Sequence, residues 1–365
     1  MQNQSEPAAI AASFAEGIPM ADYPVAEYSK REIKDAGAAL RERMPYTEEA
    51  VRTFRVAHNW RMAHALPMIR EKTQLTRLVG DNGDTAGRIK RMDSIRKKLR
   101  RSPITLDRMQ DLAGIRAIVG SVDEVRRAEA WYLARADQVA RHDDYIASPK
   151  AGGYRSVHLI RRYAGSSEAH QGQKVEIQIR TRLQHVWATA GEAIGALRGE
   201  DLKAGEGHAG WLRLLAIMSG HFAAMEGCPM PPGVSSNPDD RRDELRALDA
   251  DLSAAEVLSK MGAHERGSSA NEIAYLVRLD AGSNTVTIEP KPSYLEGGEG
   301  YFAQSDAGER VQSVLVSVNG LDALRRTYAN YFLDVGPFLF QLRQAMGRPS
   351  HGDILRDYMR HRGKL

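Results

Sequence analysis

Two acidic residues and a run of cations in the middle of the chain have the types and order that phosphoryl-type transfer needs. The segment 88 to 101, RIKRMDSIRKKLRR, carries eight Lys or Arg residues among fourteen positions and one acid, Asp93. Asp111 follows it, and Glu176 lies in a later segment, KVEIQIRT. Cations can neutralise a polyphosphate donor, and carboxylates can hold Mg²⁺. The basic run therefore predicts a polyphosphate or nucleic-acid partner, with a solvated helix face as the alternative.

A strict alternation in residues 174 to 181 predicts the strand that would carry Glu176. The apolar residues of this segment would point to one side, and Glu176, Gln178 and Arg180 to the other. Just before it, YIASPKAGGYRSVHLIRRY has a proline, two glycines and Tyr154 between two extended pieces. Such a loop lets the backbone approach a ligand closely. The strand has one face that packs and one that does chemistry or meets solvent.

The elements that must position these residues follow from hydrophobic periodicity and from turn residues. We expect a loop at 80 to 87, helices at 29–40, 47–78, 94–101, 123–140, 182–198, 210–226 and 240–260, and a buried strand at 114–120. Three strand-like runs and helices near 321–327 and 336–346 follow residue 269. This pattern predicts an α+β fold in which a mixed β-sheet is flanked by helices.

The chain length of 365 residues favours more than one domain. We expect a loose leader at 1–25, a main domain at 26–230, a helical connector at 231–269 and a small C-terminal α+β unit at 270–365. The boundary before the connector rests on CPMPPGVSSNPD, residues 228 to 239, a stretch typical of a linker.

Composition excludes several other classes of protein. No apolar stretch approaches the roughly 20 residues that a membrane span needs, and the N-terminus does not resemble a secretory signal. The single cysteine, Cys228, can form neither an internal disulfide nor a zinc site by itself, which predicts a reducing, cytoplasmic location. The chain also lacks the GxxxxGK[ST], HRD and DFG sequences, so P-loop and protein-kinase chemistry is not expected.

Four ordered motifs carry a resemblance to a known family. RIKRMDSIRKK, DLAGIRAIV, DYIASPKAGGYRSVHL and VEIQIRT resemble the synthetase domain of the RelA/SpoT family over roughly residues 80 to 200. The resemblance implies a mixed sheet flanked by helices, with ATP and Mg²⁺ at the site. It also implies in-line attack of a ribose 3′-oxygen on the β-phosphorus of ATP, with AMP as the leaving group.

The resemblance assigns roles to individual residues. It implies ATP binding by Arg88, Lys90, Ser94 and Lys98, metal binding by Asp111 and Glu176, and acceptor binding by Tyr154, Arg155, His158, Gln178 and Arg180. Glu176 would also draw the proton from the attacking hydroxyl, and Tyr154 would stack on the acceptor base. The residues by themselves leave other interpretations open: a helix cap for Asp111, a solvated strand face for Glu176 and a structural hydrogen bond for His158. For His185 and Trp187 we expect a packing role.

Two further segments narrow the resemblance. NWRMAHALP, residues 59 to 67, and the tail QSVLVSVNGLDALRRTYANYFLDVGPFL are similar to fused toxin-antitoxin proteins of the family, the CapRel group. There a C-terminal pseudo-zinc-finger unit restrains the synthetase, and a Tyr-x-x-Tyr element blocks the ATP pocket. Tyr328 and Tyr331 match this element, and the alternative places both in the small unit's own core. With one cysteine in the chain, a true Cys-rich zinc site is not expected.

The acceptor stays open at this point. The narrower resemblance implies the 3′ end of tRNA, whose modification would block translation in phage defence, with a phage protein as the trigger at the C-terminal unit. The competing interpretation is an alarmone synthetase that uses GDP or GTP to make (p)ppGpp. A catalytically inactive RNA-binding regulator is the third, but it predicts loss of Asp111 or Glu176, and both acids are present.

Overall fold

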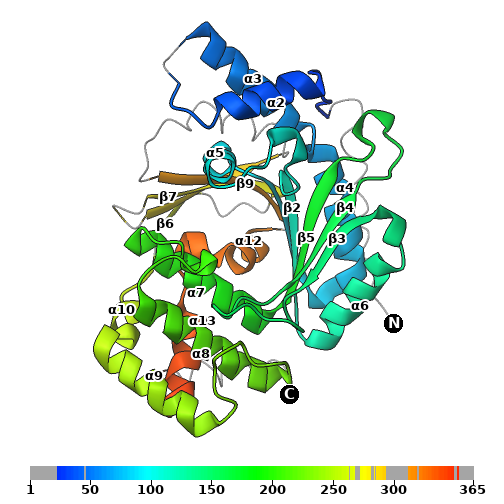
Figure 1. The fold of residues 1–365 in the computed structure, drawn as a ribbon. Coiled ribbons are helices and arrows are strands. Elements are labelled where there is room, and N and C mark those ends of the chain that lie inside the picture. The colour runs from blue at the N-terminus through cyan, green and yellow to red at the C-terminus, as the bar shows by residue number, and fades with distance from the viewer. Residues whose placement is uncertain are drawn as a thin grey trace.

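The computed structural model describes residues 23–44, 47–262, 264–267, 272–280, 283, 285–292, 311–318, 320–348 and 352. Residues 1–22 of the predicted leader lie outside the described residues. Figure 1 shows strands in the middle of the molecule, with helices on both sides of them. The predicted α+β class is therefore confirmed.

The nine described strands form one mixed sheet in the order β3-β4-β5-β2-β1-β9-β7-β8-β6. Their bounds are β1 Asp84–Ile89, β2 Ala113–Val119, β3 Val139–Asp144, β4 Val157–Arg162, β5 Lys174–Thr181, β6 His264–Gly267, β7 Ala274–Asp280, β8 Thr285–Lys291 and β9 Val311–Val318. The pairs β2–β5 and β6–β8 are parallel, and the other pairs are antiparallel.

The described helices cover both faces of this sheet. Their bounds are α2 Lys30–Ala39, α3 Glu48–Met62, α4 Ala65–Val79, α5 Met92–Arg101, α6 Val122–Leu133, α7 Arg182–Arg198, α8 Ala209–Glu226, α9 Pro238–Leu252, α10 Ala254–Ser259, α12 Leu321–Thr327 and α13 Gly336–Ala345. Short 3₁₀ turns include η6 Leu202–Ala204 and η7 Ala329–Phe332. Residues from α4 and α6 share a core with β2, β4 and β5, whereas α7 and α8 share one with the C-terminal strands and helices.

The alternating segment forms β5 within the predicted bounds. Val175, Ile177 and Ile179 are fully buried in the core under α4 and α6. Glu176 and Gln178 point to the opposite face and stay partly exposed. This period of two is the reason why the strand could be predicted from sequence, since a half-buried strand alternates in this way.

The prediction of a loop at 80–87 is wrong for the second half of that segment. Residues 84–89 form β1, which pairs with β2 on one edge and with β9 on the other. Asp and Gly are poor strand formers, but pairing on both edges overrides a local preference. Gly87 lies against Met68 of α4, where a Cβ would come within 3.4 Å of the side chain.

Two predicted helices also differ from the structure. The single helix predicted at 47–78 is two helices, α3 and α4. The helix predicted at 123–140 ends at Leu133, and β3 begins at Val139.

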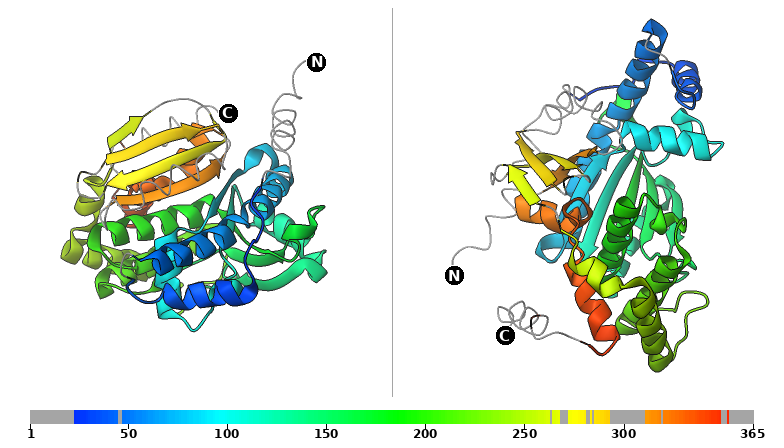
Figure 2. Two further views of the ribbon diagram at one scale, coloured as in Figure 1. Left: turned by 90° about the horizontal axis from the view of Figure 1, so that it is seen from above. Right: turned by 90° about the vertical axis from the view of Figure 1, so that its left-hand side faces the viewer.

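The C-terminal strands continue the central sheet. Ala86 pairs with Val318 and Gly87 with Ser317, so β9 extends the sheet directly beyond β1. Figure 2 shows these strands, in yellow and orange, beside the helices drawn in green. The two regions therefore share a sheet and a hydrophobic core. In the described part of the chain, no helix combines the length and apolar character that a membrane span requires.

Candidate active site

The site is built on the sheet face that looks away from α4 and α6. In the β1–β2 register Arg88 lies opposite Gly114, and in the β2–β5 register Gly114 lies beside Glu176 and Arg116 beside Gln178. Paired residues share a face, so the three strands bring these side chains to one place. The motifs that lie far apart in sequence meet here.

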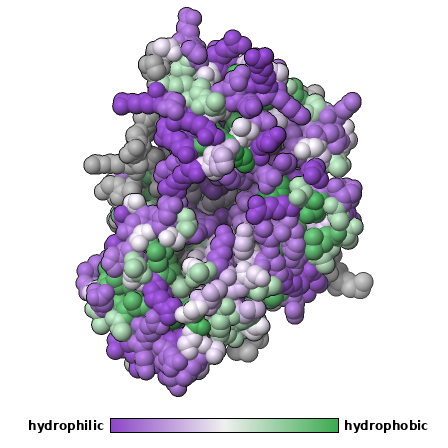
Figure 3. Space-filling view, in the orientation of Figure 1, coloured by the Kyte–Doolittle hydropathy of each residue, from purple (hydrophilic) through white to green (hydrophobic). Residues whose placement is uncertain are grey.

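A small cavity of about 50 Å³ lies in this place. Its lining residues are Ala86, Arg88, Lys90, Asp111, Gly114, Ile115, Arg116, Glu176, Gln178 and Tyr328. Figure 3 shows a face hollowed between α5 and α7, with mostly hydrophilic residues around the hollow. Nucleotide-sized ligands need pockets of several hundred Å³. The cavity is much smaller than such a pocket.

Asp111 is held by two ammonium groups. Its Oδ2 atom lies 3.0 Å from Lys90 Nζ and 2.8 Å from Lys98 Nζ. Its Oδ1 atom is buried and has no hydrogen-bond partner among the described residues. An unpaired buried carboxylate oxygen is costly, so it marks a position where a ligand or ion would gain a contact.

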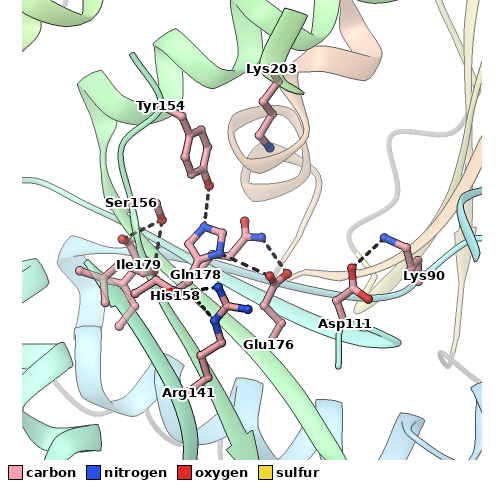
Figure 4. A network of polar contacts seen from close by, with 12 residues as sticks. Lys90, Asp111, Arg141, Tyr154, Ser156, His158, Glu176, Gln178, Ile179 and Lys203 are labelled. Carbon is pink, nitrogen blue, oxygen red and sulfur yellow. Dashed lines mark hydrogen bonds and ion pairs between the residues drawn. The ribbon is translucent and has the colours of Figure 1, made fainter. Parts of the chain in front are cut away.

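Glu176 ends a polar chain that begins at Tyr154. The Tyr154 hydroxyl lies 2.7 Å from Nε2 of His158, and His158 Nδ1 lies 3.4 Å from Glu176 Oε1 (Figure 4). Gln178 Nε2 donates to Glu176 Oε2 at 2.8 Å. Burial would raise the pKa of Glu176, but the hydrogen bond and the charge of His158 bring it to about 2. Burial would lower the pKa of His158, yet Glu176 and Tyr154 raise it. Glu176 is therefore ionised at neutral pH.

The donor set fits Mg²⁺. Asp111 and Glu176 line the same cavity, and Asp111 offers an oxygen without a partner among the described residues. Mg²⁺ is commonly held by one or two carboxylates, with water and substrate phosphates completing its shell. In the part of the chain that the structure describes, no group of three or more His, Cys, Asp and Glu side chains is arranged to hold a metal by itself. The two carboxylates beside Lys90 and Lys98 match the arrangement in which one or two carboxylates hold Mg²⁺.

Three charged residues of the site were missed by the sequence analysis. Arg116 lines the cavity from β2. Glu192 of α7 forms an ion pair with Lys203 at 2.7 Å. Burial would raise the pKa of Glu192, but the charges of Lys203 and Arg116 bring this pKa far below the usual range. Alternation along β2 would have placed Arg116 on the face of Glu176 and Gln178. Nothing in the sequence pattern singles out Glu192 or Lys203, since their meeting depends on tertiary structure.

The predicted ATP-binding residues are brought together only in part. The cavity is lined by Arg88 and Lys90, and Lys98 contacts Asp111. Ser94, on α5, does not line the cavity. Arg88 and Lys90 do not belong to the basic helix, because the first is on β1 and the second follows it. Burial alone would lower the pKa of Arg88, but the Tyr331 and Tyr328 hydroxyls and nearby carboxylates raise it.

The predicted acceptor residues also divide. His158 and Gln178 contact Glu176, and Tyr154 contacts His158. Arg155 is buried elsewhere, where Nε donates to Ser219 Oγ at 3.0 Å and another nitrogen donates to the Pro229 carbonyl.

Arg180 points to the predicted face but is 1% exposed. Its Nη2 donates to His185 Nδ1 at 2.5 Å, and His185 Nε2 lies 2.6 Å from the Arg326 carbonyl, to which it donates. Trp187 is buried and donates to the Leu215 carbonyl at 2.6 Å.

Tyr328 and Tyr331 approach the site from the C-terminal elements. Tyr328 lines the cavity directly, and the Arg116 guanidinium lies 5.8 Å from the centre of the Tyr328 ring. Arg116 also donates to the Thr327 carbonyl at 3.0 Å. Both tyrosines are buried in the core that joins α7 and α8 to the C-terminal elements. The tyrosine pair thus faces the cationic side of the site and packs in a core at the same time.

Comparisons with known proteins match parts of this chain. Residues 87–196 match a family model described as a region found in RelA / SpoT proteins. The GTP pyrophosphokinase YjbM of Bacillus subtilis is 42% identical over 110 residues, which is 28% of this chain and 51% of that protein. The GTP pyrophosphokinase of Escherichia coli strain K12 is 30% identical over 146 residues, 37% of this chain and 18% of that protein.

A solved structure also matches part of this chain. The small alarmone synthetase 1 of Bacillus subtilis, bound to its product pppGpp, is 26% identical, with a TM-score of 0.41. The match covers 49% of this chain and 94% of that one. This chain spans about half the length of the B. subtilis GTP pyrophosphokinase. The sequence matches support the RelA/SpoT family for the central segment, and the family model ends before α8 begins.

Proposed function

We propose that this protein is an ATP-dependent pyrophosphokinase. It would move the β,γ-pyrophosphate of ATP to a ribose 3′-hydroxyl and release AMP. One observation carries the proposal: Lys90 and Lys98 form ion pairs with Asp111, and Asp111 lies beside Glu176 in the same cavity. All four residues belong to the segment that matches the RelA/SpoT region. Cations for a polyphosphate and carboxylates for Mg²⁺ are the parts that such transfer requires.

The residues divide between donor and acceptor. Arg88, Lys90 and Lys98 would contact the triphosphate, because several cations are needed to offset its charge. Asp111 and Glu176 would hold Mg²⁺, which would neutralise charge that develops on the phosphates. A carboxylate with a pKa of about 2 is a weak base, so metal binding and orientation suit Glu176 better than proton abstraction.

For the acceptor we favour the 3′-terminal adenosine of tRNA. Tyr154 would stack on the base, and stacking tolerates any base, so the residue does not itself demand guanine. Gln178, Arg180 and His158 would lie along the acceptor. Guanine nucleotide is the second candidate, because two relatives that match part of this chain carry the name GTP pyrophosphokinase. In that case the product would be (p)ppGpp.

The C-terminal unit would restrain the enzyme. Tyr328 lines the cavity of about 50 Å³ together with the proposed donor residues Arg88 and Lys90, which supports this restraint. The proposed division is a catalytic domain at 26–230, a connector at 231–269 and a regulatory unit at 270–365. A phage protein that binds the regulatory unit would release the restraint, which would make the chain a fused toxin-antitoxin of phage defence. A cytoplasmic location, where ATP and tRNA occur, belongs to the same proposal.

The test uses ATP labelled at its γ-phosphate with the full chain and its Tyr328→Ala variant. Bulk tRNA, GDP and GTP are offered separately. Label on tRNA is the expected result, and it would support a translation-blocking toxin. Label on GDP or GTP in place of tRNA would overturn the tRNA assignment and support the alarmone synthetase. Absence of label on any acceptor, from either chain, would contradict the proposed reaction.

A further inference from the structure

The loop between α7 and α8, residues 199–208, lies across the proposed acceptor side of the site. It leaves α7 at Gly199, whose φ of 68° favours glycine, and Gly205 has a φ of 86°. Between them η6 places Leu202 in the hydrophobic core. Leu202 anchors the loop in the core, and the left-handed glycines on both sides of it let the chain turn back sharply.

Ion pairs tie this loop to two different elements. Arg101, at the end of α5, lies 3.2 Å from Asp201 and 3.3 Å from Glu206. Lys203 lies 2.7 Å from Glu192 of α7. The Arg101 pairs are exposed, and such pairs contribute little to stability individually. The Arg101 pairs can therefore open at low cost, whereas opening of the whole loop also breaks the less exposed Lys203–Glu192 pair and frees Leu202 from the core.

Lys203 covers the aromatic ring that would receive the acceptor base. Its ammonium lies 5.3 Å from the centre of the Tyr154 ring, and Figure 4 shows Lys203 and Tyr154 side by side. Tyr154 is 5% exposed, so its ring has no open face of the size that stacking requires. A base can stack there after the loop has moved and has taken Lys203 with it.

The interior behind Lys203 has unused donors. Arg180 Nε and Nη1, and Arg116 Nε, are buried without hydrogen-bond partners among the described residues. Arg180 is close enough to Tyr154 to help lower the pKa of its hydroxyl. Buried guanidinium N–H groups without partners are costly, and an anion would satisfy them. The region therefore suits a phosphate group next to a stacked base.

We propose that loop 199–208 is a gate over the acceptor subsite, and that Lys203 exchanges Glu192 for a phosphate of the acceptor when the gate opens. The inference rests on the proposed function, because it takes Tyr154 as the acceptor platform. The ligand is a phosphate attached to the stacked nucleoside. In a free nucleotide it is the 5′-diphosphate, and in RNA it is the backbone phosphate before the last residue.

The test measures equilibrium binding of GDP, guanosine and an RNA hairpin that ends in CCA. The full-length Tyr328→Ala chain is compared with versions that also carry Lys203→Ala or Lys203→Arg. We expect Lys203→Ala to weaken binding of one phosphate-bearing probe about tenfold, the loss of a charge-assisted contact, and Lys203→Arg to restore most of it. Guanosine, which has no phosphate, should lose no affinity in Lys203→Ala, because the variant removes only the cation that covers the Tyr154 ring. Weakening for GDP alone identifies a free nucleotide, and weakening for the hairpin alone identifies RNA.

Lys260→Ala is the matched control, since it also removes a Lys–Glu pair, with Glu256 at 2.6 Å, on an exposed helix end. It should change none of the affinities. Equal affinity of Lys203→Ala and its parent for both phosphate-bearing probes would overturn the gate, and so would an equal loss for guanosine. If labelled ATP gives no transfer while binding still depends on Lys203, the proposed reaction fails and the phosphate contact stands. If transfer occurs while binding is independent of Lys203, the reaction stands and the gate fails.

Discussion

At the scale of residues, Asp111 concentrates the chemistry of the site. Two ammonium groups neutralise one of its oxygens, and the other oxygen has no partner among the described residues. We predict that Asp111→Asn lowers transfer of label from ATP at least about a hundredfold, because an amide is a poor Mg²⁺ ligand and cannot offset two cations. Asp93→Asn, on the exposed side of α5, should leave transfer within about twofold of its parent. Equal activities of both variants would contradict this role.

Tyr154 provides a prediction that needs no substrate. Burial alone would raise the pKa of its hydroxyl, but Lys203, His158 and Arg180 lower it to about 8. One tyrosine should therefore ionise near pH 8 in absorbance at 295 nm, and Tyr154→Phe should remove that transition. A lowered pKa adds stability that is fully present above the usual value near 10 and is lost as pH falls through about 8. Lys203→Ala should move the transition upward, and an unchanged midpoint would count against the contact.

At the scale of elements, the contact between β1 and β9 fastens the C-terminal unit to the site. The paired stretch is short, with Ala86 and Gly87 opposite Val318 and Ser317. The Arg326 guanidinium supports it with two bonds to Asp84, at 2.8 and 2.7 Å. A bidentate pair fixes orientation better than a single contact does.

We predict that Arg326→Ala speeds hydrogen exchange of the β1 amides at least about threefold, because local opening would become easier. It should also raise label transfer by the otherwise native chain. Asp322→Ala is the control, since it removes an exposed contact with Arg325 at 3.5 Å on the same helix, α12. Similar exchange in β1 for both variants would mean that the Arg326 pair does not fasten the strand.

Elements differed in how far their sequence predicted them. The predicted bounds of helix α7 and strand β5 agree with the structure. A half-buried strand and a capped helix both have strong local sequence patterns. Strand β1 was not, since its glycine and aspartate indicate a loop until β2 and β9 pair with it. Likewise the types of Asp111 and Glu176 pointed to metal chemistry. The meeting of Glu192 with Lys203, and the burial of Arg180, depend on contacts that no local pattern records.

At the scale of the whole molecule, the tyrosine pair belongs to both the core and the site. Tyr328 and Tyr331 pack in the cluster that includes α7, α8 and the C-terminal strands. Tyr328→Ala should therefore destabilise the chain by roughly 3 kcal/mol, a usual cost for an aromatic side chain removed from a core. It should also enlarge the donor cavity, so that a non-hydrolysable ATP analogue binds more tightly in calorimetry. Tyr328→Phe should behave like the native chain in both respects.

The most decisive measurement is transfer of label from γ-labelled ATP by the full-length Tyr328→Ala chain, with and without Asp111→Asn. We predict that Tyr328→Ala transfers label to a 3′-hydroxyl acceptor faster than the native chain, and that adding Asp111→Asn abolishes the transfer. Transfer that survives in the double variant would contradict a site centred on Asp111. No transfer by Tyr328→Ala to tRNA, GDP or GTP would contradict the proposed reaction itself.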